Sequence, residues 1–126
     1  MKISILIPCY NEEKTIEKII NKILDLKELN LEIIIVDDNS TDSSRSIIDT
    51  KLKDKIHKLI LNDNNYGKGF SIKKGIEAAT GEVLIIQDAD LEYDPNDYKT
   101  LIKPIINNLS KVVYGSRVLH KKRYTA

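Results

Sequence analysis

The residues best suited to do chemistry lie in one acidic stretch, Asp88-Ala89-Asp90-Leu91-Glu92. Its carboxylates, those of Asp88, Asp90 and Glu92, alternate along a loop that directly follows residues 83–86, an apolar run typical of a buried strand. Carboxylates gathered at the exit of a strand repel one another unless a cation lies among them. Oxygen ligands suit Mg²⁺ and Mn²⁺, which in turn bind phosphate oxygens. The stretch therefore predicts a divalent metal site, with a solvated acidic loop as the alternative.

Two further polar clusters also follow apolar runs. Pro8-Cys9-Tyr10-Asn11-Glu12 comes after residues 3–7, and Asp37-Asp38-Asn39-Ser40-Thr41-Asp42 comes after residues 31–36. Proline cannot donate to a central ladder, so the first run should end where the first cluster begins. Both clusters thus occupy the same position as the acidic stretch, directly beyond a predicted strand.

A regular alternation of strands and helices positions these clusters. Apolar runs predict strands at 3–7, 31–36, 57–61, 83–86 and 111–114, with helices between them and a further helix from Asp94-Pro95 onward. The alternation predicts an α/β fold, with a mostly parallel, Rossmann-like sheet and helices on both faces. Ligands of such sheets bind beyond the carboxyl ends of the strands, where the strand order reverses. With the order 3-2-1-4, Tyr10 and Glu12 would lie beside Asp88 and Asp90.

Local sequence signals give three predictions about the helices. Asn11 is a candidate N-cap for the first helix. The third helix should span about residues 68–79 and end at Gly81 in a left-handed conformation. Gly69 and Gly75 lie inside that helix, where glycine lowers stability unless another part of the chain or a ligand approaches closely.

Composition limits the class of protein. The chain has 126 residues, of which 41% are hydrophobic, enough for one domain with a buried core. A net charge of +1 gives no global electrostatic reason to bind nucleic acid or a membrane surface. Cys9 is the single cysteine and cannot form an internal disulfide, and the N-terminal apolar run is too short for a signal peptide or a membrane span. We therefore expect a cytoplasmic protein that does not bind nucleic acid.

Five motifs together resemble the inverting glycosyltransferases of family 2. They are Pro8-Cys9-Tyr10-Asn11-Glu12, Val36-Asp37-Asp38-Asn39-Ser40-Thr41-Asp42, Asn65-Tyr66-Gly67-Lys68-Gly69, Gln87-Asp88-Ala89-Asp90-Leu91-Glu92 and Gly115-Ser116-Arg117. The resemblance covers essentially the whole chain and is closest to the branch of dolichol-phosphate and polyprenyl-phosphate mannose and glucose synthases. It implies a GT-A-like fold and a single nucleotide-sugar-binding domain over residues 1–126. This domain would be incomplete at its C-terminus, because relatives continue with an acceptor-binding half.

The resemblance also implies roles for individual residues. The implied nucleotide-binding residues are Pro8, Tyr10, Glu12, Asp37, Asp38, Lys68, Asp88 and Ala89. Within this set, Asp37 could hold its loop together while Asp38 faces the ligand. Asp88, Asp90 and Glu92 would bind Mg²⁺ or Mn²⁺ as a bridge to the diphosphate. The implied catalytic residues are Asp90 and Arg117, whose guanidinium suits phosphate oxygens of the donor or the acceptor.

The implied reaction moves a hexose, with inversion at the anomeric carbon, from a GDP-mannose-type or UDP-glucose-type donor to an acceptor. The branch implies a polyprenyl phosphate as acceptor, for cell envelope glycan biosynthesis. Such an acceptor is already an anion at neutral pH, so the reaction needs no strong general base. The resemblance further implies a position at the cytoplasmic face of the membrane, with peripheral association through the missing C-terminal part.

Other classes fit the same features less well. A non-catalytic nucleotide-sugar-binding fragment has the same sequence pattern and stays open. A receiver-type signalling domain shares the alternating fold, and residues 35–39 resemble its acidic pocket. However, the acid pair here follows the second predicted strand, not the first, and no lysine closes the fifth. A nucleotidyltransferase would need a glycine-rich, basic loop at residues 9–12, and the chain has none there.

Overall fold

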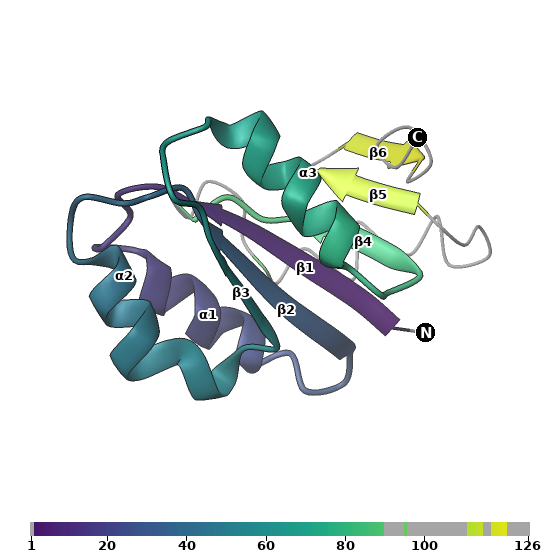
Figure 1. The fold of residues 1–126 in the computed structure, drawn as a ribbon. Coiled ribbons are helices and arrows are strands. Elements are labelled where there is room, and N and C mark those ends of the chain that lie inside the picture. Colours follow the sequence, from purple (N-terminus) through teal and green to yellow (C-terminus); the bar gives the residue numbers. More distant parts are fainter. Residues whose placement is uncertain (1, 90–94, 96–110, 115–116, 121–126) are drawn as a thin grey trace.

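One sheet organises the chain. The structure, a computed structural model, describes residues 2–89, 95, 111–114 and 117–120. The strands are β1 (Lys2–Cys9), β2 (Asn30–Asp37), β3 (Lys58–Leu61), β4 (Val83–Ile86), β5 (Lys111–Tyr114) and β6 (Arg117–His120). Their order is β3-β2-β1-β4-β5-β6, and only the β5–β6 pair is antiparallel (Figure 1). The predicted order 3-2-1-4 and the mostly parallel sheet are confirmed.

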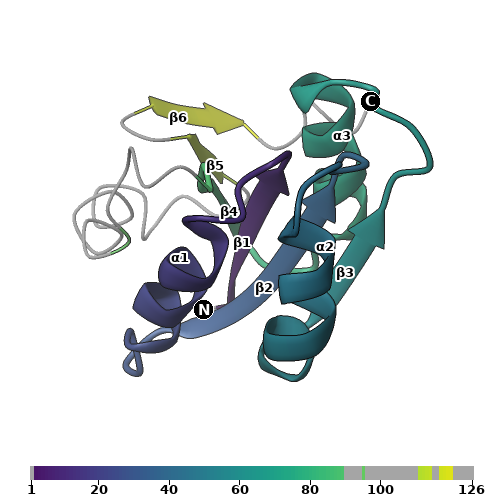
Figure 2. The ribbon, with the colours of Figure 1, turned by 90° about the vertical axis from the view of Figure 1, so that its left-hand side faces the viewer.

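Helices cover both faces of the sheet, as predicted (Figure 2). Helix α1 (Ile16–Leu24) and helix α2 (Ser44–Ile47) lie on one face. Helix α2 continues as the π-helix η1 (Ile48–Leu52) and the 3-10 helix η2 (Lys53–Lys55). Helix α3 (Lys68–Ala78) lies on the other face. None of the helices in the described residues is long and apolar enough to cross a membrane.

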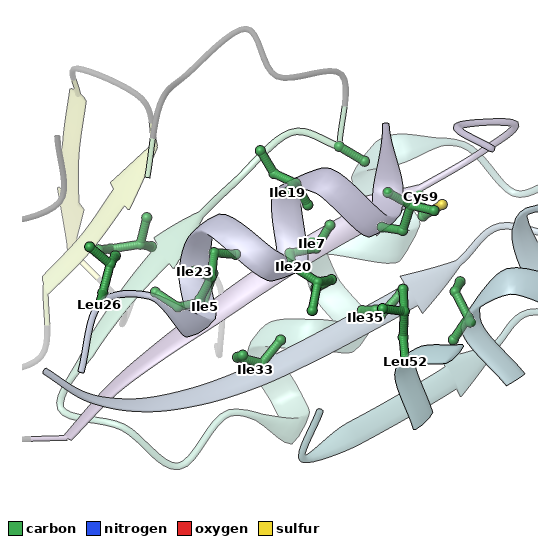
Figure 3. Close-up of a cluster of buried hydrophobic side chains, with 14 of the residues drawn as sticks. Ile5, Ile7, Cys9, Ile19, Ile20, Ile23, Leu26, Ile33, Ile35 and Leu52 are labelled. Carbon is green, nitrogen blue, oxygen red and sulfur yellow. The ribbon is translucent and has the colours of Figure 1, made fainter. Parts of the chain in front are cut away.

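The alternation of side chains along β1 explains how one strand serves two cores. Ile5 and Ile7 face the cluster under α1, where they pack with Ile20 and Ile23 (Figure 3). Leu6 points the opposite way, into the cluster under α3. A strand buried on both faces reads as one continuous apolar run, which is the pattern that predicted it.

Close packing explains why the residues at positions 75 and 81 are glycine. A Cβ built on Gly75 would meet Leu6 Cδ1 at 2.0 Å, so α3 can lie against β1 only because this residue has no side chain. Gly81 was predicted to end α3 in a left-handed conformation, and that prediction is wrong. The helix ends at Ala78, Ala79 is extended, and Gly67 is the positive-φ glycine of the described residues. A Cβ on Gly81 would instead meet the Ser4 backbone nitrogen at 2.7 Å.

Other element ends also differ from the sequence-based expectation. Helix α1 begins at Ile16 with Thr15 at its N-cap position, so Asn11 is not the N-cap. Asn11 has a φ of 53°, and its side-chain oxygen accepts the backbone N–H of Thr41 at 2.8 Å. The reason is tertiary, because this amide joins the loops after β1 and β2. Strand β6, which contains Arg117, was not predicted, and the helix predicted from Asp94-Pro95 lies outside the described residues.

A buried carboxylate lies at the end of the sheet opposite the polar clusters. Glu32 is 4% exposed and accepts hydrogen bonds from Ser4 Oγ at 2.8 Å and from the Thr80 backbone and hydroxyl at 2.9 and 2.8 Å. Lys2 Nζ and Lys58 Nζ lie 3.4 and 3.5 Å from Glu32 Oε2. Burial by itself raises the pKa of Glu32, but these donors and the charge of Lys58 outweigh it and lower the pKa to about 2. Glu32 is therefore ionised throughout the neutral and mildly acidic range.

Candidate functional site

A cavity of about 260 Å³ opens at the carboxyl ends of β1, β2 and β4. Its lining consists of Pro8, Cys9, Tyr10, Glu12, Asp38, Asn65, Gly67, Lys68, Ser71, Asp88 and Ala89. Strands β1 and β4 are direct neighbours, with Leu6 opposite Ile86, which brings the first polar cluster beside Asp88 and Ala89. Every predicted nucleotide-binding residue except Asp37 lines this cavity. Asp90, Glu92 and the side chain of Arg117 lie outside what the structure describes.

Asp38 organises the floor of the cavity. It is 4% exposed, and its Oδ1 accepts Asn62 Nδ2 and the backbone N–H of Tyr66, both at 2.9 Å. Its Oδ2 accepts the backbone N–H of Gly67 at 2.8 Å. Burial raises the pKa of Asp38, but these three donors outweigh burial and hold the pKa below its usual value. The ionised carboxylate therefore fixes the loop that leads from β3 into α3.

This loop needs both a special backbone conformation and a buried polar partner. Gly67 has a φ of 95°, which is strained for residues with a side chain, and it precedes Lys68, the first residue of α3. Asn62 is 5% exposed and donates to Ser71 Oγ at 3.1 Å as well as to Asp38. Sequence reasoning did not single out Asn62 or Ser71. The position of Asn62, directly after the third strand, was the signal that could have found it.

Asp37 lies behind the cavity. Its side chain is fully buried, and it accepts the backbone N–H of Ser40 at 3.0 Å, the Ser40 hydroxyl at 2.6 Å and Arg45 Nε at 2.6 Å. Because Asp37 is not part of the lining, its position supports the loop-holding role and not a direct contact with nucleotide. Any effect of Asp37 on a ligand would pass through the loop that it holds.

The first polar cluster is joined to both neighbouring loops. The Glu12 backbone N–H donates to Ser44 Oγ at 2.9 Å. The Thr15 hydroxyl lies 3.3 Å from Glu12 Oε2 and also within hydrogen-bonding distance of the Ala89 carbonyl oxygen. Tyr10 lines the cavity and remains 42% exposed, so its ring can pack against a flat ligand group.

Asp88 presents a carboxylate that already holds a cation. Its Oδ1 forms an ion pair with Lys68 Nζ, and its side chain is 11% exposed. The backbone before it is fixed, because the Gln87 N–H donates to the Leu6 carbonyl at 2.9 Å. A hard divalent ion suits the same oxygen chemistry, so Asp88 fits its predicted role as a metal ligand. No group of three His, Cys, Asp or Glu side chains with metal-ligand geometry occurs among the residues described.

Cys9 lines the same cavity, yet its thiol has low reactivity. Burial, followed by the charge of Asp37, raises the pKa of the Cys9 thiol to about 12. A thiol with that pKa carries almost no thiolate at neutral pH and is a poor nucleophile. The cavity is therefore suited to binding through carboxylates and an aromatic ring, not to covalent catalysis by cysteine.

The sequence is similar to a known protein family and to known proteins. Residues 4–125 match the family described as "Glycosyl transferase family 2". A dolichol-phosphate mannosyltransferase of Pyrococcus furiosus is 34% identical over 118 residues, which cover 93% of this chain and 33% of that protein. An undecaprenyl-phosphate 4-deoxy-4-formamido-L-arabinose transferase of Aeromonas hydrophila is 33% identical over 106 residues, covering 80% of this chain and 32% of that protein. The chain thus spans about a third of the length of these relatives.

Solved structures support the same assignment. Glucosyl-3-phosphoglycerate synthase of Mycobacterium tuberculosis, solved with Mn²⁺, UDP and glucosyl-3-phosphoglycerate, has a TM-score of 0.69 and 25% identity over 82% of this chain and 39% of that one. The GT-A-like fold is thereby confirmed, and the receiver-type alternative is wrong. On the family match and these likenesses, the chain belongs to glycosyltransferase family 2.

Proposed function

We propose that this chain binds a nucleoside-diphosphate sugar and a divalent metal, and that it transfers the hexose with inversion to a polyprenyl phosphate. The single observation that carries this proposal is the cavity at the switch point of the sheet. It gathers an exposed aromatic ring on Tyr10, the carboxylates of Glu12, Asp38 and Asp88, and the ammonium group of Lys68. Such groups match the ring, hydroxyl and phosphate parts of a nucleotide sugar.

The base and the ribose of the donor have matching groups in the cavity. The ring of Tyr10 would pack against the base, and Glu12 and Asp38 would accept hydrogen bonds from ribose hydroxyls or a base N–H. Asp38 is suited to this role because three donors already fix its carboxylate in place. A preorganised acceptor loses little freedom when the ligand binds.

The diphosphate would lie at the other end of the cavity, near Asp88 and Lys68. Asp88 would hold the metal, together with Asp90 and Glu92 from outside the described residues. Bound there, Mg²⁺ or Mn²⁺ would offset negative charge on the departing nucleoside diphosphate. Arg117 would contact phosphate oxygens of the donor or the acceptor.

The proposed acceptor comes from the names of the relatives, which act on dolichol phosphate and undecaprenyl phosphate. A phosphate monoester is already an anion at neutral pH, so the cavity would need to orient it for in-line attack and need not deprotonate it. A lipid acceptor would also bring the protein to the cytoplasmic face of a membrane. The alternative, a nucleotide-sugar-binding part without turnover of its own, has the same donor site.

Calorimetric titration tests the proposal. The chain would be titrated with GDP-mannose, UDP-glucose and UDP-GlcNAc, each with and without Mn²⁺. We expect one of these donors to bind only with metal, and binding to weaken at least tenfold in Asp90→Ala, because a metal-ligand carboxylate is lost. Asp49→Ala, which removes an exposed acid on η1 that does not line the cavity, is the matched control. Metal-independent binding, or no binding of any donor, would refute the proposal.

A further inference from the structure

Lys68 and Asp88 form an ion pair, and their side chains differ in how far they are exposed to solvent. Asp88 is the second residue after β4, and the backbone N–H of the residue between them, Gln87, donates to the Leu6 carbonyl oxygen of β1 at 2.9 Å. Its side chain is 11% exposed, whereas that of Lys68 is 49% exposed. Lysine also has a long, flexible stem. Lys68 is therefore the member of the pair that can move.

The backbone of Lys68 is nevertheless tied to the ligand cavity. Lys68 is the first residue of α3, directly after Gly67, whose N–H is held by Asp38 at 2.8 Å. Both Lys68 and Asp88 line the cavity. The backbone of Lys68 is thus fixed beside the cavity, while its long side chain can reach both Asp88 and the space where a ligand would lie.

A carboxylate oxygen that binds a divalent ion directly cannot keep an ammonium group in the same place, because the two cations repel each other. Binding of a metal at Asp88 Oδ1, the oxygen that Lys68 holds, would therefore displace Lys68. The displaced ammonium would remain within the cavity, where a diphosphate is the strongest acceptor that it could find.

From this geometry we infer that Lys68 is an exchangeable counterion: it holds Asp88 while the site is empty and transfers to the diphosphate when metal and nucleotide bind. The inference rests on the proposed function, because it assigns Lys68 a part in the same site. It has a specific thermodynamic consequence. Lys68 competes with the metal in the absence of nucleotide and cooperates with it in its presence, so Lys68 couples the two binding events.

Measurement of Mn²⁺ binding tests this inference without any turnover. Free Mn²⁺ would be followed by electron paramagnetic resonance during titration of wild type, Lys68→Met, Lys68→Arg and Lys73→Met, first without nucleotide. Lys73 is an exposed lysine on the same helix and controls for the general loss of positive charge. We expect Mn²⁺ to bind Lys68→Met at least about fivefold more tightly than wild type. Lys68→Arg and Lys73→Met should stay close to wild type.

The second arm repeats the titrations with saturating UDP or GDP. The factor by which nucleotide strengthens Mn²⁺ binding should be several-fold smaller in Lys68→Met than in wild type, because that variant has no ammonium group to transfer. The affinity of the nucleotide itself should also fall in Lys68→Met.

The outcomes separate this inference from the proposed function. Unchanged or weaker Mn²⁺ binding in Lys68→Met without nucleotide would overturn the inference, whatever the nucleotide does. A lower melting temperature with the same Mn²⁺ affinity would mean that the ion pair serves only stability, and would overturn it equally. If no nucleotide binds wild type, the proposed function fails, while the first arm still decides whether Lys68 competes with metal. Absence of Mn²⁺ binding in every variant would overturn both.

Discussion

The Asp38 carboxylate accepts the backbone N–H of Gly67 at 2.8 Å, at the point where the chain turns into α3. This bond joins the end of β2 to a loop that follows β3. It makes the cavity floor depend on one ionised side chain. This hydrogen bond and the packing around the sheet determine the effects on stability and ligand binding that we expect below.

Replacing Asp38 by Asn should weaken both the fold and the site. An amide cannot supply two anionic acceptors, so at least one of the three donors would be left without its partner. We expect a loss of about 1–3 kcal/mol in the free energy of unfolding and at least a tenfold loss in nucleotide-sugar affinity. Urea denaturation and calorimetry measure the two effects. Asp63→Asn, at an exposed acid of the same loop, is the control. Wild-type stability in Asp38→Asn would contradict the role given to Asp38.

Acid should destabilise the fold through Glu32. The pKa of Glu32 falls from 4.5 in the unfolded chain to about 2 in the folded protein. The resulting stability is fully present above pH 4.5 and is lost as the pH falls from there towards 2. The expected loss is at most about 3 kcal/mol. Urea denaturation between pH 6 and 3 should show this decline, and Glu32→Gln should show a flatter profile. Identical profiles for the two proteins would contradict the assignment.

Two glycine substitutions should change the stability of the protein in opposite directions. Gly81→Ala places a methyl group 2.6 Å from Ser4 Oγ and 2.9 Å from the Lys2 carbonyl oxygen, so the backbone must shift. We expect a loss of about 1–3 kcal/mol of stability. Gly69→Ala adds a methyl group in α3 with nothing within 4 Å, and should stabilise the protein by about 0.5 kcal/mol through helix propensity. Thermal denaturation distinguishes them. A stable Gly81→Ala protein would contradict the packing described between β1 and the turn before β4.

Cys9 should resist alkylation in the folded protein. The thiol is buried, and its pKa of about 12 leaves almost no thiolate at pH 8. Incubation with iodoacetamide, followed by mass measurement, should show modification only after denaturant is added. Rapid modification of the native protein would show that the cavity opens more widely than the structure describes.

The sequence predicted those features that depend on periodicity. Apolar runs located the strands β1 to β5. The predicted end of the first strand before Pro8 is wrong, because β1 continues beside β2 through Pro8 to Cys9. The position of polar clusters at the ends of β1, β2 and β4 predicted that they would meet at one cavity. The different roles of Asp37, the last residue of β2, and Asp38 did not come from periodicity. They were an alternative in which Asp37 holds its loop together while Asp38 faces the ligand. Asp37 faces its own loop, and Asp38 faces the cavity, as their alternation across the strand end allows.

The features that were missed depend on contacts between distant segments. Asn11 resembles an N-cap, but its side chain bonds to Thr41 across a loop. Gly81 resembles a helix terminator, but its role is to let the chain pass close to Ser4. Asn62 shows its value only when Asp38 and Ser71 are known to lie beside it. Local helix and turn propensities contain no information about partners that are distant in the sequence.

The cavity at the carboxyl ends of β1, β2 and β4 is the proposed binding site of the nucleotide sugar. Backbone amide NMR shifts, recorded during titration with each donor, test it most directly; Mg²⁺ would replace the paramagnetic Mn²⁺. We expect the largest shifts at Tyr10, Asp38, Gly67 and Ala89, with little change at the opposite end of the sheet near Glu32. Shifts concentrated away from these residues, or none with any donor, would contradict it.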